Sequence, residues 1–245
     1  MKKAVLFDLD GVIIDTERHG HRVAFNEAFK KCGYPDVSWD EDLYHSLLQV
    51  GGGKERVKHY FDKFHRGSAP PADMESFVKD MHRLKTDLFV EMLPKLPLRP
   101  GVRRFMLELR EMGIAMGICT TSNEKVAQTV AEVILSDIPF SVVIAGDMVK
   151  RKKPDPEIYN MAKDILKVDQ ALVVEDSHIG VRAAKQAGCT VVATYNGYTE
   201  GEDLSPADFI VSCLGDPDGE KAVVKKAAFP IAADGVVGAS SFVAR

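Results

Sequence analysis

Short apolar runs alternate with amphipathic segments along most of the chain. The apolar runs lie at residues 4–7, 114–119, 142–145, 171–174 and 190–193, with a weaker one at 209–211. Runs of this length, bounded by polar residues or glycine, are typical of strands buried on both faces of a parallel sheet. Between them, apolar residues recur every three or four positions, as at Val102 to Leu109 and Ile158 to Ile165, which indicates helices. The pattern predicts a doubly wound, mainly parallel, Rossmann-like α/β sheet.

One long stretch, residues 16–95, breaks this alternation. It contains helical spacings around residues 23–29, 57–64 and 77–88 but no convincing strand, and it runs into a proline-rich segment at 93–101. We therefore expect an inserted all-helical cap at 16–95, within a discontinuous catalytic core of residues 1–15 and 96–215. Residues 216–245 show no clear periodicity and are expected to form a C-terminal tail whose role the sequence leaves open.

Composition narrows the functional classes without choosing among them. The 245 residues are 45% hydrophobic and 28% charged, so the chain is folded and globular rather than fibrous or disordered. A net charge of -4 gives no overall attraction to nucleic acid or to anionic membranes, and no apolar run approaches the roughly 20 residues that span a bilayer. The four cysteines show no paired spacing, which disfavours a zinc site or a disulfide framework and favours a reducing compartment.

Polar side chains follow the predicted strands at the points where they end. Because ligands bind beyond the carboxyl ends of parallel strands, these residues are the first candidates for a site. They are Asp8 and Asp10 with Gly11 after the first run, Thr120, Thr121, Ser122 and Asn123 after the second, Lys153 after the third, and Glu175 and Asp176 after the fourth.

Four carboxylates in one crevice need a cationic partner. Two charges about 4 Å apart interact by roughly 4 kcal/mol at an effective dielectric constant of 20. Mg²⁺, which prefers oxygen ligands, together with Lys153 would offset this repulsion, and the hydroxyls of Thr120 and Ser122 suit phosphate oxygens. Singly, these motifs are commonly a turn, a helix N-cap or a solvated loop. Together, at the ends of four strands, they predict phosphoryl transfer.

These residues resemble the four motifs of the haloacid dehalogenase-like hydrolases, in the branch with a helical cap after the first motif. The resemblance covers residues 3 to about 213 and implies that Asp8 is a nucleophile that forms an aspartyl-phosphate. It further implies that Asp10 is the acid and base, and that Thr120 and Lys153 bind the transferring phosphoryl group. The implied Mg²⁺ ligands are Asp8, the carbonyl of Asp10, Asp176 and, directly or through water, Glu175.

Three segments of the predicted cap suit a second phosphate. They contain Glu17 and His21, then Gly52, Gly53, Lys54 and Glu55 behind Gly51, and finally His82 and Lys85. Glycines before a helix expose backbone N–H groups, and the lysines supply positive charge. A flexible hinge loop with solvated charges remains the alternative, and His21 alone could equally be an ordinary surface or core histidine.

The same segments look like the CbbY-type members of the family, most closely the plastid form. This resemblance implies hydrolysis of xylulose 1,5-bisphosphate to xylulose 5-phosphate, which removes an inhibitor of Rubisco, without predicted direct contact with Rubisco. It places the following residues around the sugar bisphosphate: Glu17, His21, Gly52, Gly53, Lys54, Glu55, His82, Lys85, Thr121, Ser122 and Asn123. It also implies the plastid stroma, whereas the composition suits the cytoplasm of a bacterium equally. We expect a monomer.

Two other functions remain open at this point. A phosphosugar mutase of the β-phosphoglucomutase kind would share the core residues and return the phosphoryl group to another hydroxyl. A non-catalytic module that binds a phosphometabolite or Rubisco would have no need of both Asp8 and Asp10. A carbon–halogen hydrolase is disfavoured, because that chemistry does not require the acidic cluster of Asp10, Glu175 and Asp176.

Overall fold

The computed structural model describes residues 2–50 and 52–243. Contacts between residues divide the chain into two compact units, one of Met1–Asp15 with Pro97–Arg245 and the other of Thr16–Leu96. We call them the core unit and the cap unit, and each is described by itself. Of the described helices, none is both long enough and apolar enough to cross a bilayer.

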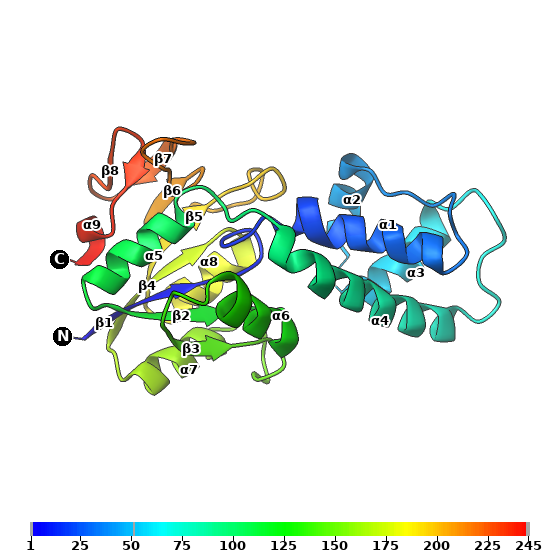
Figure 1. Cartoon of the computed structure of the whole chain (residues 1–245), viewed down its shortest axis with the longest axis horizontal. Helices are drawn as coiled ribbons and strands as arrows, with labels where there is room; N and C mark the ends of the chain where they lie inside the picture. Colours follow the sequence, from blue (N-terminus) through cyan, green and yellow to red (C-terminus); the bar gives the residue numbers. More distant parts are fainter. Residues whose placement is uncertain (1, 51, 244–245) are drawn as a thin grey trace. The chain divides into compact units, whose positions relative to one another are not determined.

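The core unit is built on a seven-stranded sheet (Figure 1). Its spatial order is β3-β2-β1-β4-β5-β6-β7, with β1 to β6 parallel and β7 antiparallel to β6. The strands are β1 (Lys3–Phe7), β2 (Ala115–Cys119), β3 (Phe140–Ile144), β4 (Gln170–Glu175), β5 (Thr190–Thr194), β6 (Phe209–Val211) and β7 (Val224–Ala227). The mainly parallel α/β sheet predicted from the apolar runs is therefore confirmed.

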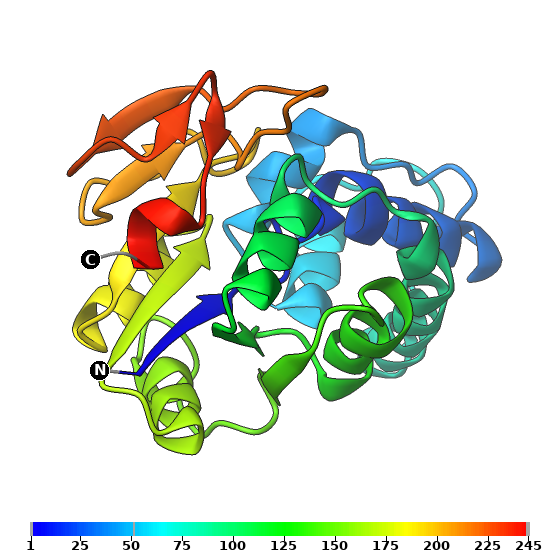
Figure 2. The ribbon, with the colours of Figure 1, turned by 60° about the vertical axis from the view of Figure 1, so that its left-hand side comes forward.

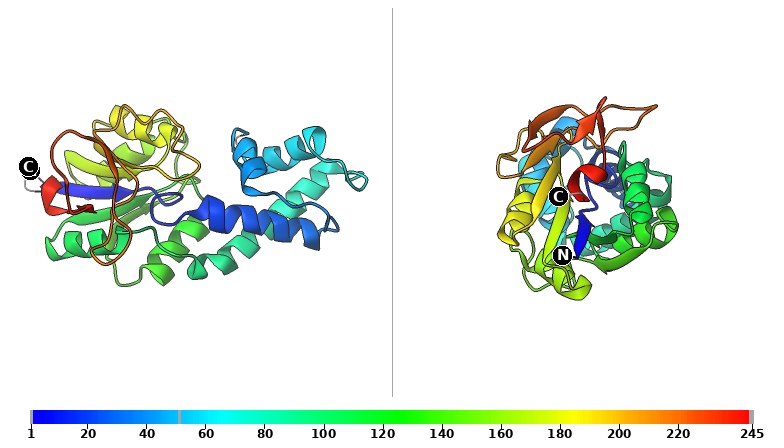
Figure 3. Two further views of the ribbon diagram at one scale, coloured as in Figure 1. Left: turned by 90° about the horizontal axis from the view of Figure 1, so that it is seen from above. Right: turned by 90° about the vertical axis from the view of Figure 1, so that its left-hand side faces the viewer.

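Helices cover both faces of this sheet, as the turned views show (Figures 2 and 3). Successive residues of β1 point to opposite faces. Leu6 joins the apolar cluster under α7 and α8, which includes Ile158 and Val181, whereas Phe7 meets Phe105 of α5 edge to face at 6.3 Å. The core helices are α5 (Val102–Glu111), α6 (Glu124–Thr129) continued by the π-helix η3 (Val130–Ile134), α7 (Glu157–Leu166) and α8 (His178–Gln186).

Helix α7 begins at Glu157, and its N-cap is Pro156. The Asp155 carboxylate accepts a hydrogen bond from the N–H of Glu157 at 3.0 Å. A proline has no N–H to satisfy, so the cap position tolerates it without loss of a hydrogen bond.

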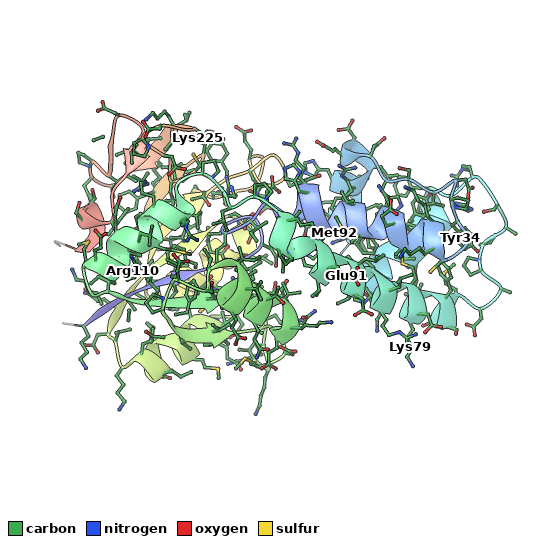
Figure 4. The ribbon with its side chains drawn as sticks, in the orientation of Figure 1. Tyr34, Lys79, Glu91, Met92, Arg110 and Lys225 are labelled. Carbon is green, nitrogen blue, oxygen red and sulfur yellow. The ribbon has the colours of Figure 1, made fainter. Side chains whose placement is uncertain are left out.

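The C-terminal residues add to the core unit. They form β7, the hairpin of β8 (Ala232–Ala233) and β9 (Val236–Val237), and α9 (Ser240–Val243). Phe242 contacts both Phe209 and Phe229 in edge-to-face or tilted pairs. Lys225 of β7, labelled in Figure 4, lies over the ring of Tyr195 at 3.9 Å. The sequence pattern missed these elements because they are short and their apolar residues lack a regular period.

The cap unit is all helical. It consists of η1 (Glu17–His21), α1 (Arg22–Lys31), α2 (Glu41–Leu48), α3 (Gly53–Lys63), α4 (Met74–Met92) and η2 (Leu93–Lys95). Its interior is aromatic: Trp39 packs against Phe25, Phe29 and Tyr60, with ring centroids 4.9 to 5.4 Å apart. The Asp40 carboxylate caps α2 by accepting from the N–H of Leu43. The spacing of apolar residues did not predict helix α2.

Candidate active site

A buried lysine joins the ends of three strands in the core unit. The ammonium of Lys153 donates to Asp8 Oδ1 at 2.6 Å, to Glu175 Oε1 at 2.6 Å and to the carbonyl of Cys119 at 2.9 Å. Asp8 directly follows β1, while Glu175 and Cys119 end β4 and β2. These carboxyl ends are adjacent because β1 lies between β2 and β4 in the sheet.

Glu175 is held on every side and is fully buried. Its Oε1 also accepts from the hydroxyl of Tyr159 at 2.6 Å, and its Oε2 accepts from the N–H groups of Asp176 at 3.0 Å and Ser177 at 3.4 Å. The carboxylate lies against the first turn of α8, where a Cβ on Gly180 would come within 2.0 Å of it. Glycine at position 180 therefore makes room for the charged group under the helix.

Asp176 supplies a third buried carboxylate. Its Oδ2 accepts from the side-chain amide of Asn196 at 2.7 Å. One oxygen each from Asp8, Glu175 and Asp176 lies within 4.8 Å of the others. Carboxylate oxygens are the ligands that Mg²⁺ prefers, so these residues fit a hard divalent cation.

Burial and mutual repulsion shape the protonation of this cluster. Burial raises the pKa of Asp8 to about 8, against the lowering effect of Lys153 and with the support of the Glu175 and Asp10 charges. Burial likewise raises the pKa of Asp176, and the Glu175 and Asp8 charges add to the rise. Burial alone would lower the pKa of Lys153, but the Asp8 and Glu175 carboxylates raise it above its usual value. The negative charge exceeds what one ammonium balances, and a bound cation would relieve it.

Asp10 lies beside the hydroxyl residues that follow β2. The hydroxyl of Ser122 donates to Asp10 Oδ2 at 2.5 Å, and the hydroxyl of Thr120 lies 3.5 Å from the same oxygen. Thr120 also accepts from the N–H of Ser122 at 3.0 Å, so the turn is held in place. Asn123 caps α6 by accepting from the N–H of Val126 at 3.0 Å. The side-chain oxygen of Asn123, which we expected to contact substrate, therefore has a structural role at the start of this helix.

Thr121 contributes its backbone to the shape of this turn. A Cβ on Gly146 would lie 2.2 Å from the carbonyl oxygen of Thr121, and the N–H of Gly146 donates to the carbonyl of Ser122 at 2.8 Å. The exposed side chain of Thr121 adds no hydrogen bond to this contact. The close approach of two backbones fixes the direction in which the β2 turn leaves the sheet.

In the cap unit, positive groups gather around His21. The ammonium of Lys85, itself buried, donates to His21 Nδ1 at 2.7 Å and lies 4.8 Å from the ring centroid of Phe25. Since Nδ1 accepts, the ring proton of a neutral His21 sits on Nε2. Burial, together with the charges of Lys85 and Lys54, lowers the pKa of His82 to about 4. The cluster therefore contains two ammonium groups beside an uncharged His82.

The glycine segment opens α3 next to this cluster. Gly52 has φ of +93°, which favours glycine, and Glu55 folds back so that its carboxylate would meet a Cβ at Gly52. A Cβ on Gly53 would lie 2.8 Å from His82 Nε2. The predicted residues Gly52, Gly53, Glu55 and His82 are thus neighbours, whereas Gly51 lies outside the described residues.

Glu17 sits in a hydrogen-bonded chain of its own. The hydroxyl of the fully buried Tyr44 donates to Glu17 Oε2 at 2.5 Å, and the guanidinium of Arg56 donates to the Tyr44 hydroxyl at 3.1 Å. Arg56 also lies 5.4 Å from the centroid of the Tyr44 ring. This chain orients the Glu17 carboxylate within the cap unit.

Sequence reasoning missed three side chains that support the core carboxylates. Tyr159 looks like an apolar residue of an amphipathic helix, Asn196 lies in a loop after β5, and Arg99 lies in the proline-rich segment. The sequence separation between Asn196 and Asp176 is 20 residues, and local spacing carries no information about such a contact. A polar residue just beyond β5, at the same sheet edge as the other strand ends, was the available signal for Asn196.

Comparisons with known proteins agree with this geometry. Residues 2–188 match the family described as haloacid dehalogenase-like hydrolase. The CBBY-like protein of Arabidopsis thaliana is 44% identical over 230 residues, which are 90% of this chain and 72% of that protein.

Two solved structures are similar over most of their length. A mutant of CbbY from Rhodobacter sphaeroides in complex with xylulose 1,5-bisphosphate has a TM-score of 0.73 and 35% identity, and the match covers 87% of this chain and 95% of the other. A β-phosphoglucomutase homologue from Thermotoga maritima has a TM-score of 0.68 and 29% identity, with 86% and 94% covered. The chain belongs to the haloacid dehalogenase-like hydrolases, in the branch that contains the CbbY proteins.

Proposed function

We propose that the protein is a Mg²⁺-dependent phosphatase that converts xylulose 1,5-bisphosphate to xylulose 5-phosphate. The observation that carries the proposal is the buried arrangement in which Lys153 bridges Asp8 and Glu175 at 2.6 Å beside Asp176. The CbbY complex with this sugar bisphosphate supports the choice of substrate. The cationic cap cluster supports a substrate with a second phosphate.

The core residues have complementary parts in such a reaction. The Asp8 carboxylate attacks phosphorus and displaces the sugar oxygen, to which Asp10 gives a proton, leaving an aspartyl-phosphate. Asp10 then takes a proton from water, which attacks phosphorus and releases phosphate from Asp8. The hydroxyl of Ser122, 2.5 Å from Asp10, holds that carboxyl group in one orientation through both steps.

Asp8 and Asp176, together with the carbonyl of Asp10, are the proposed Mg²⁺ ligands. The Glu175 oxygens accept from Lys153, from Tyr159, from two backbone N–H groups and from the Ser177 hydroxyl, so that carboxylate is committed to protein donors. We therefore place Glu175 outside the direct coordination shell. When bound, Mg²⁺ would neutralise the carboxylates and the phosphate oxygens, which favours attack by one anion on another.

The test is phosphate release from xylulose 1,5-bisphosphate with Mg²⁺ present. We expect turnover by the wild type and none above background by Asp8→Asn, because an amide cannot act as the nucleophile. Asp137→Asn, which alters a surface aspartate paired with Arg103, is the matched control and should retain wild-type turnover. Equal turnover by wild type and Asp8→Asn would contradict the assignment of the nucleophile.

A phosphosugar mutase is the second candidate, because the β-phosphoglucomutase homologue shares the fold at 29% identity. A mutase would convert glucose 1-phosphate to glucose 6-phosphate without release of free phosphate. We expect the opposite result, release of phosphate without isomerisation. Conversion of glucose 1-phosphate at a rate above that of bisphosphate hydrolysis would favour the mutase.

The proposed biological role follows from the product. Removal of xylulose 1,5-bisphosphate would relieve inhibition of Rubisco, and the resemblance of the cap segments to the plastid form of CbbY implies a location in the plastid stroma. Addition of the protein to Rubisco that has been inhibited with this bisphosphate should restore carboxylation. The Asp8→Asn variant should not restore it.

A further inference from the structure

A largely buried arginine ties the return from the cap to the sheet edge that carries the site. Arg99 donates to the carbonyl of Gly11, to the carbonyls of Thr194 at 2.8 Å, Tyr195 at 2.8 Å and Ser212 at 2.6 Å, and to the hydroxyl of Thr194 at 3.2 Å. All these acceptors are neutral oxygens. Burial of a guanidinium costs desolvation free energy, which the hydrogen bonds to these carbonyls and the attraction of the Asp176 carboxylate offset.

The segments that Arg99 holds meet at one carboxylate oxygen. Gly11 approaches Asp176 so closely that a Cβ at Gly11 would lie 2.0 Å from Asp176 Oδ2. Asn196, which donates to the same oxygen at 2.7 Å, directly follows Tyr195. The Arg99 guanidinium therefore connects the Gly11 turn to the loop of Tyr195 and Asn196, and both lie against the Asp176 carboxylate.

Two of the residues that Arg99 binds, Gly11 and Thr194, are also connected to other parts of the carboxylate cluster. Gly11 is the residue after Asp10, whose carbonyl is a proposed Mg²⁺ ligand, so a shift of the Gly11 turn would move that carbonyl. The hydroxyl of Thr194 lies 3.4 Å from the carbonyl of Glu175 at the end of β4. Groups that orient metal ligands without touching the metal commonly change metal affinity when they are altered.

We propose that Arg99 is a positioning residue for the divalent cation, because it fixes the Gly11 turn and the 194–196 segment against Asp176. The proposal rests on the proposed function, since it takes Asp176 and the Asp10 carbonyl as Mg²⁺ ligands. The proposal thereby gives a role in metal binding to Arg99, a residue of the proline-rich segment 93–101. That segment supplies none of the proposed Mg²⁺ ligands.

Arg104 provides a matched control. It is also a largely buried arginine, and it donates to the carbonyls of Leu214 at 3.0 Å, Gly215 at 2.8 Å and Val237 at 3.0 Å. These carbonyls belong to the C-terminal part of the core unit, and within the described residues they are not partners in the hydrogen bonds of Asp8, Glu175 or Asp176. Loss of Arg104 therefore removes similar hydrogen bonds without a direct effect on the carboxylate cluster.

The experiment is direct measurement of Mg²⁺ binding to the purified full chain by calorimetry, with Mn²⁺ and electron paramagnetic resonance as a second readout. We expect Arg99→Met to weaken binding about tenfold or more, and Arg99→Lys to recover part of the loss. Arg104→Met should lower the melting temperature yet leave the Mg²⁺ affinity within about twofold of the wild type. Neither readout depends on turnover.

Several outcomes would overturn the proposal. Wild-type Mg²⁺ affinity in folded Arg99→Met would do so, as would an equal loss of affinity in Arg104→Met. If Arg99→Met does not fold, Asn196→Ala tests the loop that Arg99 holds against the same carboxylate and must also weaken binding. A wild-type protein that binds no Mg²⁺ would instead refute the metal site of the proposed function, and with it the role of Arg99.

Discussion

Gly180→Ala is a small change that should disturb the most buried carboxylate of the site. Alanine in place of glycine inside a helix would ordinarily stabilise the protein by about 1 kcal/mol. Here the added Cβ would lie 2.0 Å from the Glu175 carboxylate, which Lys153, Tyr159 and two backbone N–H groups hold in place. The carboxylate must therefore move, and its hydrogen bonds must lengthen or break.

The magnitude follows from the two opposing effects. Disruption of a buried ion pair costs roughly 3–5 kcal/mol, so a net destabilisation of about 2–4 kcal/mol remains after the helical preference is subtracted. For a chain of this size, that corresponds to a melting temperature lower by roughly 5–15 °C. Turnover should fall as well, because Lys153 also holds Asp8 at 2.6 Å.

Thermal denaturation followed by circular dichroism measures the effect, with Gly201→Ala as the control because a Cβ there meets nothing within 4 Å. Glu175→Asp withdraws the carboxylate by one methylene, so Gly180→Ala should cost less stability in that background than in the wild type. A Gly180→Ala protein as stable as the wild type would refute the reasoning, as would an equal cost in both backgrounds.

Three further predictions concern the cap unit. Lys54→Ala should raise KM for the sugar bisphosphate more than for a small phosphate monoester such as p-nitrophenyl phosphate, and equal effects in steady-state kinetics would count against a second phosphate site. Tyr44→Phe removes the hydroxyl that donates to Glu17 and should cost about 1–3 kcal/mol of stability with a raised KM; a silent substitution in both assays would contradict this role. Because the pKa of His82 is lowered to about 4 in the folded protein, the unfolded chain binds more protons between about pH 4 and 6.5, and stability must fall as pH falls through that window. His82→Gln should therefore lose less melting temperature than the wild type when the pH is lowered from 7.5 to 5.

The chain's apolar runs were sufficient to predict the parallel sheet, because each buried strand is a local feature of four to six residues. The ends of those strands then indicated which polar residues should gather, since parallel strands present their carboxyl ends at one edge. The structure brings Asp8, Lys153, Glu175 and Asp176 together at that edge.

Side chains that act through long-range hydrogen bonds could not be predicted in this way. Arg99 binds carbonyls that are 88 to 113 residues away in the sequence, and no periodicity encodes such a separation. Tyr159 is fully buried on α7 and has the position of a core aromatic, so its hydroxyl contact with Glu175 is invisible in the pattern. The short strands near the C-terminus were missed for a different reason, because two to four residues are too few to show alternation.

The central place of β1 has a consequence for biosynthesis. Its two sheet partners are β2 and β4, which the ribosome makes about a hundred or more residues after β1. At 5–20 residues per second, β1 waits roughly ten to thirty seconds for β4, whereas the helices of residues 16–96 can pair as soon as they emerge. The strand that leads to Asp8 is thus translated first but joins the sheet late. Until β4 has been made, the apolar side chains of β1 stay exposed and can associate with other nascent chains.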